Sequence, residues 1–102
     1  MGWTVIDVVR PIAGTGQNIT IGAASVPSAA LGTTSNAQVV LLSAIGGNCH
    51  IALGTVPVAT GTDMLIKASD PPIGIRIAGG EKIAVIQDGS STGTLNIIEA
   101  TH

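Results

Sequence analysis

The sequence of 102 residues has almost no aromatic side chains, because Trp3 is the only one and Phe and Tyr are absent. Proteins that bind single-stranded nucleic acid stack successive bases on several rings, so this composition argues against that class. Charge is also scarce: 10% of the residues are charged, against roughly 25% in an ordinary soluble domain. The formal net charge of −2 leaves no positive stripe for a phosphate backbone. We therefore expect no nucleic-acid partner.

Cysteine and long apolar runs are scarce too. The single cysteine, Cys49, excludes a disulfide within the chain. The longest mainly apolar stretch, Val39–Ile45, is far shorter than the roughly 18 residues of a membrane span. The first residues show no basic cluster followed by a long apolar run, so no secretory signal is expected. These features predict a soluble protein, made in a reducing interior, with no membrane partner.

The residues that are abundant favour strands and turns. A third of the sequence is Ile, Val or Thr, whose branched side chains fit a pleated sheet better than a helix. Fourteen Gly and five Pro interrupt the chain at short intervals. Because 45% of the residues are hydrophobic and the net charge is small, the composition is not that of a disordered chain. We expect one all-β domain.

Alternating apolar residues and turn residues place the strands. The predicted fold is a single β-sandwich over residues 1–102, jelly-roll-like, with about eight short antiparallel strands. Residues 1–16 form its first strand or an N-terminal arm. Turns at 46–48 and 88–93 are expected to join neighbouring strands as hairpins, and a turn at 79–80 to lead from one strand into the next. The expected strands are residues 4–10, 18–22, 25–26, 38–45, 49–53, 63–68, 73–78, 81–87 and 94–99.

Reactive side chains do not form a recognisable catalytic or metal-binding set. Cys49 and His50 are adjacent in a predicted strand and therefore point to opposite faces, so they cannot serve one site. We expect Cys49 in the core and His50 on the outer face. Asp70 and Asp88 precede turn residues, where Asp commonly serves the backbone. The prediction is a protein that is not an enzyme and holds no metal or cofactor.

Three residues are candidates for contact with a partner: Trp3, Arg10 and Arg76. A lone Trp near the start of the chain is either a lid on the open end of the sandwich or an anchor in a partner's pocket. A small domain with so few charges also has an unusually apolar exterior, which favours association with other proteins. We therefore expect the working protein to be covered by partner chains.

The sequence from Val39 onward reads VVLLSAIGGNCHIALGTVPVAT and then DMLIKASDPPIGIRIAGGEKIAVIQDGSSTGTLNIIEA. This part, about two-thirds of the chain, resembles the decoration or cement proteins of tailed-bacteriophage capsids. The resemblance implies a jelly-roll-like domain, assembled as a homodimer or alternatively a homotrimer. Such a protein clamps neighbouring major capsid proteins on the outer surface of the mature head, after synthesis in the host cytoplasm. It implies no catalysis, no cofactor and no nucleic-acid contact.

Other functions fit the same composition. The chain could be another virion component, such as a fibre, a knob or a part of the head–tail connector. Small jelly rolls also bind sugars, although sugar rings usually pack on Trp or Tyr, and only Trp3 is present. A small enzyme is the least supported reading, because no convergent group of catalytic residues is visible.

Overall fold

The computed structural model describes residues 10–33 and 38–101, and in these residues it contains nine strands and no helix. Most of the predicted strand over residues 4–10 lies outside the described residues, as does Trp3. Pro11, which immediately follows that prediction, is part of a strand, because an edge strand tolerates a residue without an N–H. The strands are β1 Arg10–Pro11, β2 Gln17–Ile21, β3 Val26–Pro27, β4 Val39–Ile45, β5 Cys49–Gly54, β6 Met64–Ile66, β7 Ile73–Arg76, β8 Lys82–Gln87 and β9 Gly93–Thr101.

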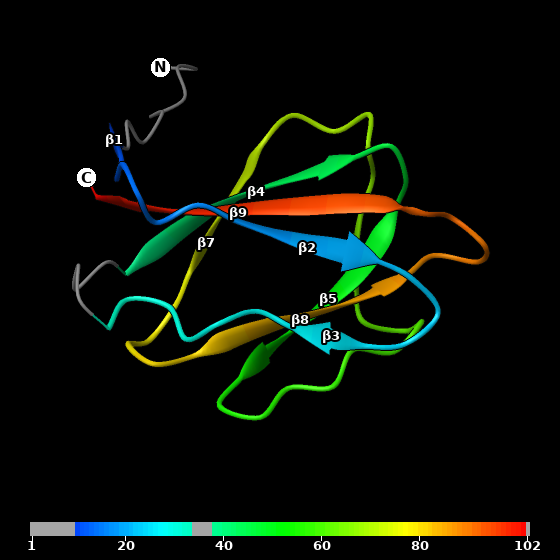
Figure 1. The fold of residues 1–102 in the computed structure, drawn as a ribbon, viewed down its shortest axis with the longest axis horizontal. Helices are drawn as coiled ribbons and strands as arrows, with labels where there is room; N and C mark the ends of the chain where they lie inside the picture. The colour runs from blue at the N-terminus through cyan, green and yellow to red at the C-terminus, as the bar shows by residue number, and fades with distance from the viewer. Residues whose placement is uncertain (1–9, 34–37, 102) are drawn as a thin grey trace, which may run out of the picture.

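The strands form two antiparallel sheets (Figure 1). In the first sheet β9 is central, with β4 and then β7 on one side. On the other side of β9, β1 and β2 pair with successive parts of the same strand. The second sheet has the order β3-β8-β5-β6. With β2-β9-β4-β7 facing β3-β8-β5-β6, the predicted jelly-roll-like sandwich is confirmed.

The two turns predicted to be hairpins, at 46–48 and 88–93, are not hairpins, and the predicted turn at 79–80 also connects strands of different sheets. The turn at 46–48 joins β4 to β5, the turn at 79–80 joins β7 to β8, and residues 88–92 join β8 to β9. In each case the two strands belong to different sheets. Gly46, Gly80 and Gly89 adopt positive φ there, as in a hairpin, but the chain crosses to the other layer because its apolar faces must meet in the core. Among the nine strands that the structure describes, only β5 and β6 are consecutive strands paired with each other.

The core lies between the two inner faces. Alternate residues of β4 and β9 point inward, and β5 and β8 meet them from the second sheet. The predicted alternation in β7 is also correct, since Ile73 and Ile75 pack against the core. None of the described core residues is aromatic, so the interior between these strands is filled by many small aliphatic side chains. The core cluster is Ile21, Leu31, Val40, Leu42, Ala44, Cys49, Ile51, Ile66, Ile77, Ile83, Val85, Leu95 and Ile97.

Candidate functional site

Exposed hydrophobic side chains concentrate at one edge of the second sheet. Seven large hydrophobic residues of the described chain are exposed, and five of them belong to the end of β5, the connection after it and β6. Among these five residues, Val56 and Val58 are the most exposed, with 87% and 68% of their surface accessible. We call the group Leu53, Val56, Val58, Met64 and Leu65 the apolar edge.

The apolar edge includes residues on both faces of β6, the edge strand of the second sheet. Leu65 is paired with His50, on the outer face of the sheet. Met64 is paired with Ile51, whose side chain points into the core. In the part of the chain that the structure describes, β6 pairs with β5 alone, so its other side has no strand neighbour. This edge therefore combines apolar side chains with unpaired strand backbone, and both features suit contact with another protein.

The connection that carries Val56 and Val58 is fixed to the sheet. Ala59 is 2% exposed, and its N–H donates to Ser25 Oγ at 2.9 Å. Four residues further on, the Asp63 carboxylate accepts hydrogen bonds from the Thr60 N–H at 2.7 Å and the Thr60 hydroxyl at 3.2 Å. The two valines are consequently exposed on a segment that is held on its far side, and not at the tip of a loose loop.

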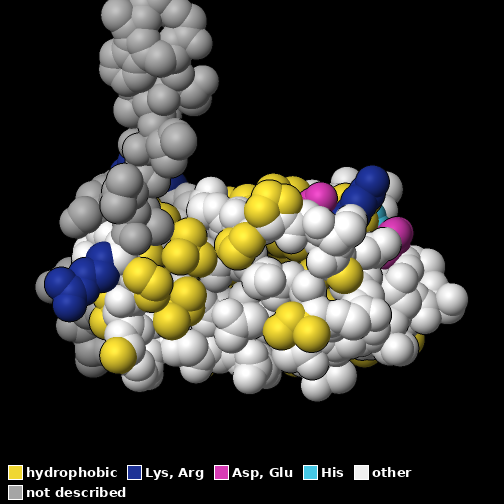
Figure 2. Space-filling view, turned by 90° about the horizontal axis from the view of Figure 1, so that it is seen from above, with side chains coloured by type: hydrophobic (Ala, Val, Ile, Leu, Met, Phe, Trp, Pro, Cys, Tyr) yellow, Lys and Arg dark blue, Asp and Glu magenta, His cyan; other side chains and the backbone are white. Residues whose placement is uncertain are grey.

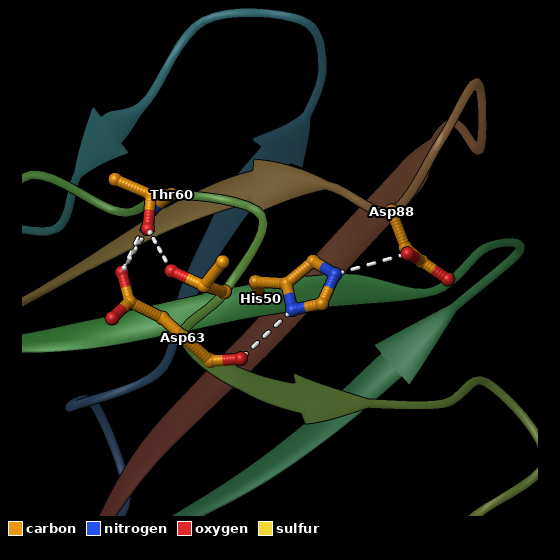
Figure 3. Close-up of polar contacts among 5 residues, drawn as sticks. His50, Thr60, Asp63 and Asp88 are labelled. Carbon is orange, nitrogen blue, oxygen red and sulfur yellow. Dashed lines mark hydrogen bonds and ion pairs between the residues drawn. The ribbon is translucent and has the colours of Figure 1, made fainter.

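His50 adds a further attachment for the same connection (Figure 3). The His50 ring lies on the outer face of the second sheet, as predicted, but it is only 7% exposed. Its Nδ1 is 2.9 Å from the Asp63 carbonyl oxygen, and its Nε2 is 2.9 Å from Asp88 Oδ1. The ring thus joins β5 to the segment before β6 and to the turn after β8.

Both contacts favour the charged form of the ring. The hydrogen bond to the Asp63 carbonyl and the one to the Asp88 carboxylate raise the pKa of His50 above its ordinary value of 6.5, while burial acts in the opposite direction. With both ring nitrogens engaged, neither is available as a catalytic base. These partners cannot be predicted from the sequence, because Asp63 and Asp88 are distant from His50 along the chain and Asp88 precedes a turn that accounts for it locally.

Cys49, next to His50, points the other way. Its side chain is fully buried in the core, as predicted, and burial raises the pKa of the thiol to about 11. Cys49 and His50 therefore form no joint site. Among residues 10–33 and 38–101, no group of three or more His, Cys, Asp or Glu side chains is placed to hold a metal ion.

The predicted partner contacts Arg10 and Arg76 are not part of the apolar edge, because both belong to strands of the first sheet. Arg10, in β1, pairs with Thr101, and Arg76, in β7, pairs with Val39. Both are exposed and lie at the same end of the first sheet, on strands at its opposite edges. Three strand spacings separate their backbones by roughly 14 Å. The structure thus brings two of the three candidates to one end of one sheet, and the third, Trp3, lies outside the described residues.

The outer face of the first sheet carries little charge. Apolar and small polar side chains alternate with the core residues along β4 and β9, and Asn18 and Asn96 form a hydrogen bond across β2 and β9 at 3.0 Å. Figure 2 shows one side of the molecule on which the charged side chains lie toward the two ends, with uncharged and hydrophobic groups between them. The sparse charge of the sequence is therefore a property of the folded surface.

Comparison with protein-family models, with curated proteins and with solved structures finds no match for this chain. The described residues include no helix long and apolar enough to cross a membrane.

Proposed function

We propose that this chain is a structural virion protein that binds the outside of a tailed-phage head and cements neighbouring major capsid proteins. The apolar edge is the observation that carries this proposal, because it presents large hydrophobic side chains at the open edge of a sheet. The resemblance of residues 39–102 to decoration proteins supports the major capsid protein as the partner. A low surface charge supports it, because such a surface loses little hydration free energy when another protein covers it.

Because the connection that carries Val56 and Val58 is held in place, binding at the apolar edge costs little conformational entropy. A side chain that is already held in place loses less conformational entropy on binding than one on a mobile loop. Val56 and Val58 project from a segment attached through Ala59, Asp63 and His50, so that loss is small for them. Burial of a Val side chain contributes about 1.5–3 kcal/mol. The pair can therefore supply a substantial part of the affinity at each site.

Cementing follows from binding to the assembled shell alone. A protein that binds neighbouring capsid subunits together, and not the separated subunits, shifts the equilibrium toward the shell. Many identical sites on one head add their contributions, so a modest affinity at each site stabilises the whole. We expect the added protein to be a homodimer, with a homotrimer as the alternative, and light scattering after gel filtration distinguishes the two.

The test uses mature heads of the encoding phage that lack this protein. Purified wild-type protein is added, and bound copies and the disruption temperature of the heads are measured. We expect the wild-type protein to bind and to raise that temperature. The double variant Val56→Ser/Val58→Ser is expected to bind about tenfold or more weakly, because it removes apolar area that the contact buries.

The matched control is Ile45→Ser, which removes a 56% exposed hydrophobic side chain at the end of β4, outside the apolar edge. The double variant and the Ile45→Ser control should both have melting temperatures close to that of the wild type, since exposed side chains contribute little to folding stability. Heads that bind no wild-type protein would contradict the proposed function. Equal loss of binding in the Ile45 control and the double variant would contradict the role of the apolar edge.

A further inference from the structure

The His50 ring is surrounded by hydrogen-bond acceptors. A backbone carbonyl oxygen accepts only, and so does an ionised carboxylate. The Asp63 carbonyl and Asp88 Oδ1 each lie 2.9 Å from a ring nitrogen, so both contacts are hydrogen bonds only when both nitrogens carry a proton. A neutral ring has one N–H, and its second nitrogen would then direct a lone pair at an acceptor.

The other neighbours of the ring do not change this balance. On the outer face His50 is paired with Leu65 of β6 and Ile86 of β8, and neither side chain titrates. Charge acts on the ring from Asp88, after β8, and from Asp63, before β6, and both carboxylates favour the charged ring. The Asp63 carboxylate itself is directed at Thr60 (Figure 3).

We propose that His50 is a proton-dependent tie, which in its charged form fastens the turn after β8 and the connection before β6 to the start of β5. This inference concerns the loops of the domain and stands independently of the proposed function. The His50 ring contacts two segments that are distant from it in sequence. The charged ring can donate a hydrogen bond to both of them, and the neutral ring to only one.

Loss of the proton releases one of the two contacts, the one with Asp88. The acceptor on Asp63 is a backbone carbonyl of a half-buried residue and cannot rotate away by itself, whereas the Asp88 side chain is 41% exposed and can turn to water. The neutral ring therefore keeps its Nδ1–H on the carbonyl and loses Asp88. The turn over residues 88–92 then retains its backbone attachment, the hydrogen bond from the Asp88 N–H to the Asn48 carbonyl, but loses its side-chain attachment.

The direction of the pH effect follows from the raised pKa of His50. A group whose pKa is higher in the folded state stabilises the fold fully below its unfolded value of 6.5. That stabilisation is lost as the pH rises through the folded pKa. Both contacts are therefore present below pH 6.5, and the contact with Asp88 is lost as the pH rises through the raised pKa of His50.

The experiment is an NMR titration of the ring nitrogens in the full chain. The signals of His50 are distinguished from those of His102 with a His102→Gln variant. We expect wild-type His50 to carry both protons at pH 6.5 and to titrate above that value. We also expect the backbone signals of residues 89–92 to shift with the same midpoint, because their turn is attached through Asp88.

Two variants, each lacking one negative charge, distinguish the effect of the His50–Asp88 hydrogen bond from the effect of a change in net charge. In Asp88→Asn the new amide can donate to a neutral ring nitrogen, so the pKa of His50 should fall. Asp70→Asn is the matched control, because Asp70 Oδ2 accepts from the Lys67 N–H at 3.2 Å and has no contact with His50. It should leave the titration of His50 unchanged.

A wild-type midpoint at or below 6.5 would overturn the proposal, and this measurement decides even if a variant fails to fold. Equal midpoints in the Asp88 and Asp70 variants would also overturn it, as would signals of residues 89–92 that do not follow the titration of His50.

Discussion

Ser28 provides a sharp test of how the second sheet is held together. Just after β3, the Ser28 N–H donates to the Ile83 carbonyl at 2.8 Å, while the Ile83 N–H donates to Ser28 Oγ at 2.9 Å. The hydroxyl thus takes a role that a strand carbonyl normally fills. Both residues are buried, so Ser28→Ala leaves the Ile83 N–H without an acceptor. A buried donor that loses its partner costs about 1–3 kcal/mol.

The assay is reversible thermal or urea unfolding. For a domain of this size, each kcal/mol corresponds to about 4–8 °C in melting temperature. We expect Ser28→Ala to lower the unfolding free energy by about 1–3 kcal/mol. Ser69→Ala, at an exposed turn position, is the control and should change it by less than about 0.5 kcal/mol. A loss for Ser28→Ala as small as that of the control would refute the reasoning, because the Ile83 N–H would then have found another acceptor.

Two further predictions concern packing. Gly93→Ala should cost about 3 kcal/mol or more in urea unfolding, since a Cβ there would collide with the Ile45 carbonyl. Gly74→Ala should instead be neutral or stabilise by about 0.5 kcal/mol, because its Cβ would lie 3.6 Å from Leu41 Cδ2; similar losses at both positions would contradict this contrast. Cys49 should react with a thiol reagent at pH 8 only as fast as the domain opens, since burial raises its pKa to about 11; immediate labelling of the folded protein would disagree.

The positions of the strands could be predicted from the sequence, whereas their pairing could not. Alternation gives the inward face of a strand, as it did for Ile73 and Ile75, but it does not say which sheet the strand joins. The turn at 46–48 illustrates the difficulty. A glycine with positive φ suits a hairpin and a crossing between layers equally well, so local chemistry does not decide between them.

The candidate site was harder to predict, because it depends on contacts between distant segments. The exposure of Val56 and Val58 follows from the burial of Ala59 on their own segment, and one small residue among Gly, Thr and Val gives no distinctive pattern. His50 was correctly placed on the outer face, but its burial results from the connection that covers it. Its partners became visible only when the fold brought Asp63 and Asp88 to the same ring.

The central position of β9 has a consequence for how the protein is made. β9 is the last strand in chain order, yet it pairs with β1, β2 and β4. A ribosome therefore synthesises those three strands before the strand that unites them exists. Pairing between such distant segments is slow, on a scale of milliseconds to seconds. The nascent chain must keep its apolar faces from aggregating until β9 emerges, and a truncated product that lacks β9 retains only the pairing of β4 with β7 from the first sheet.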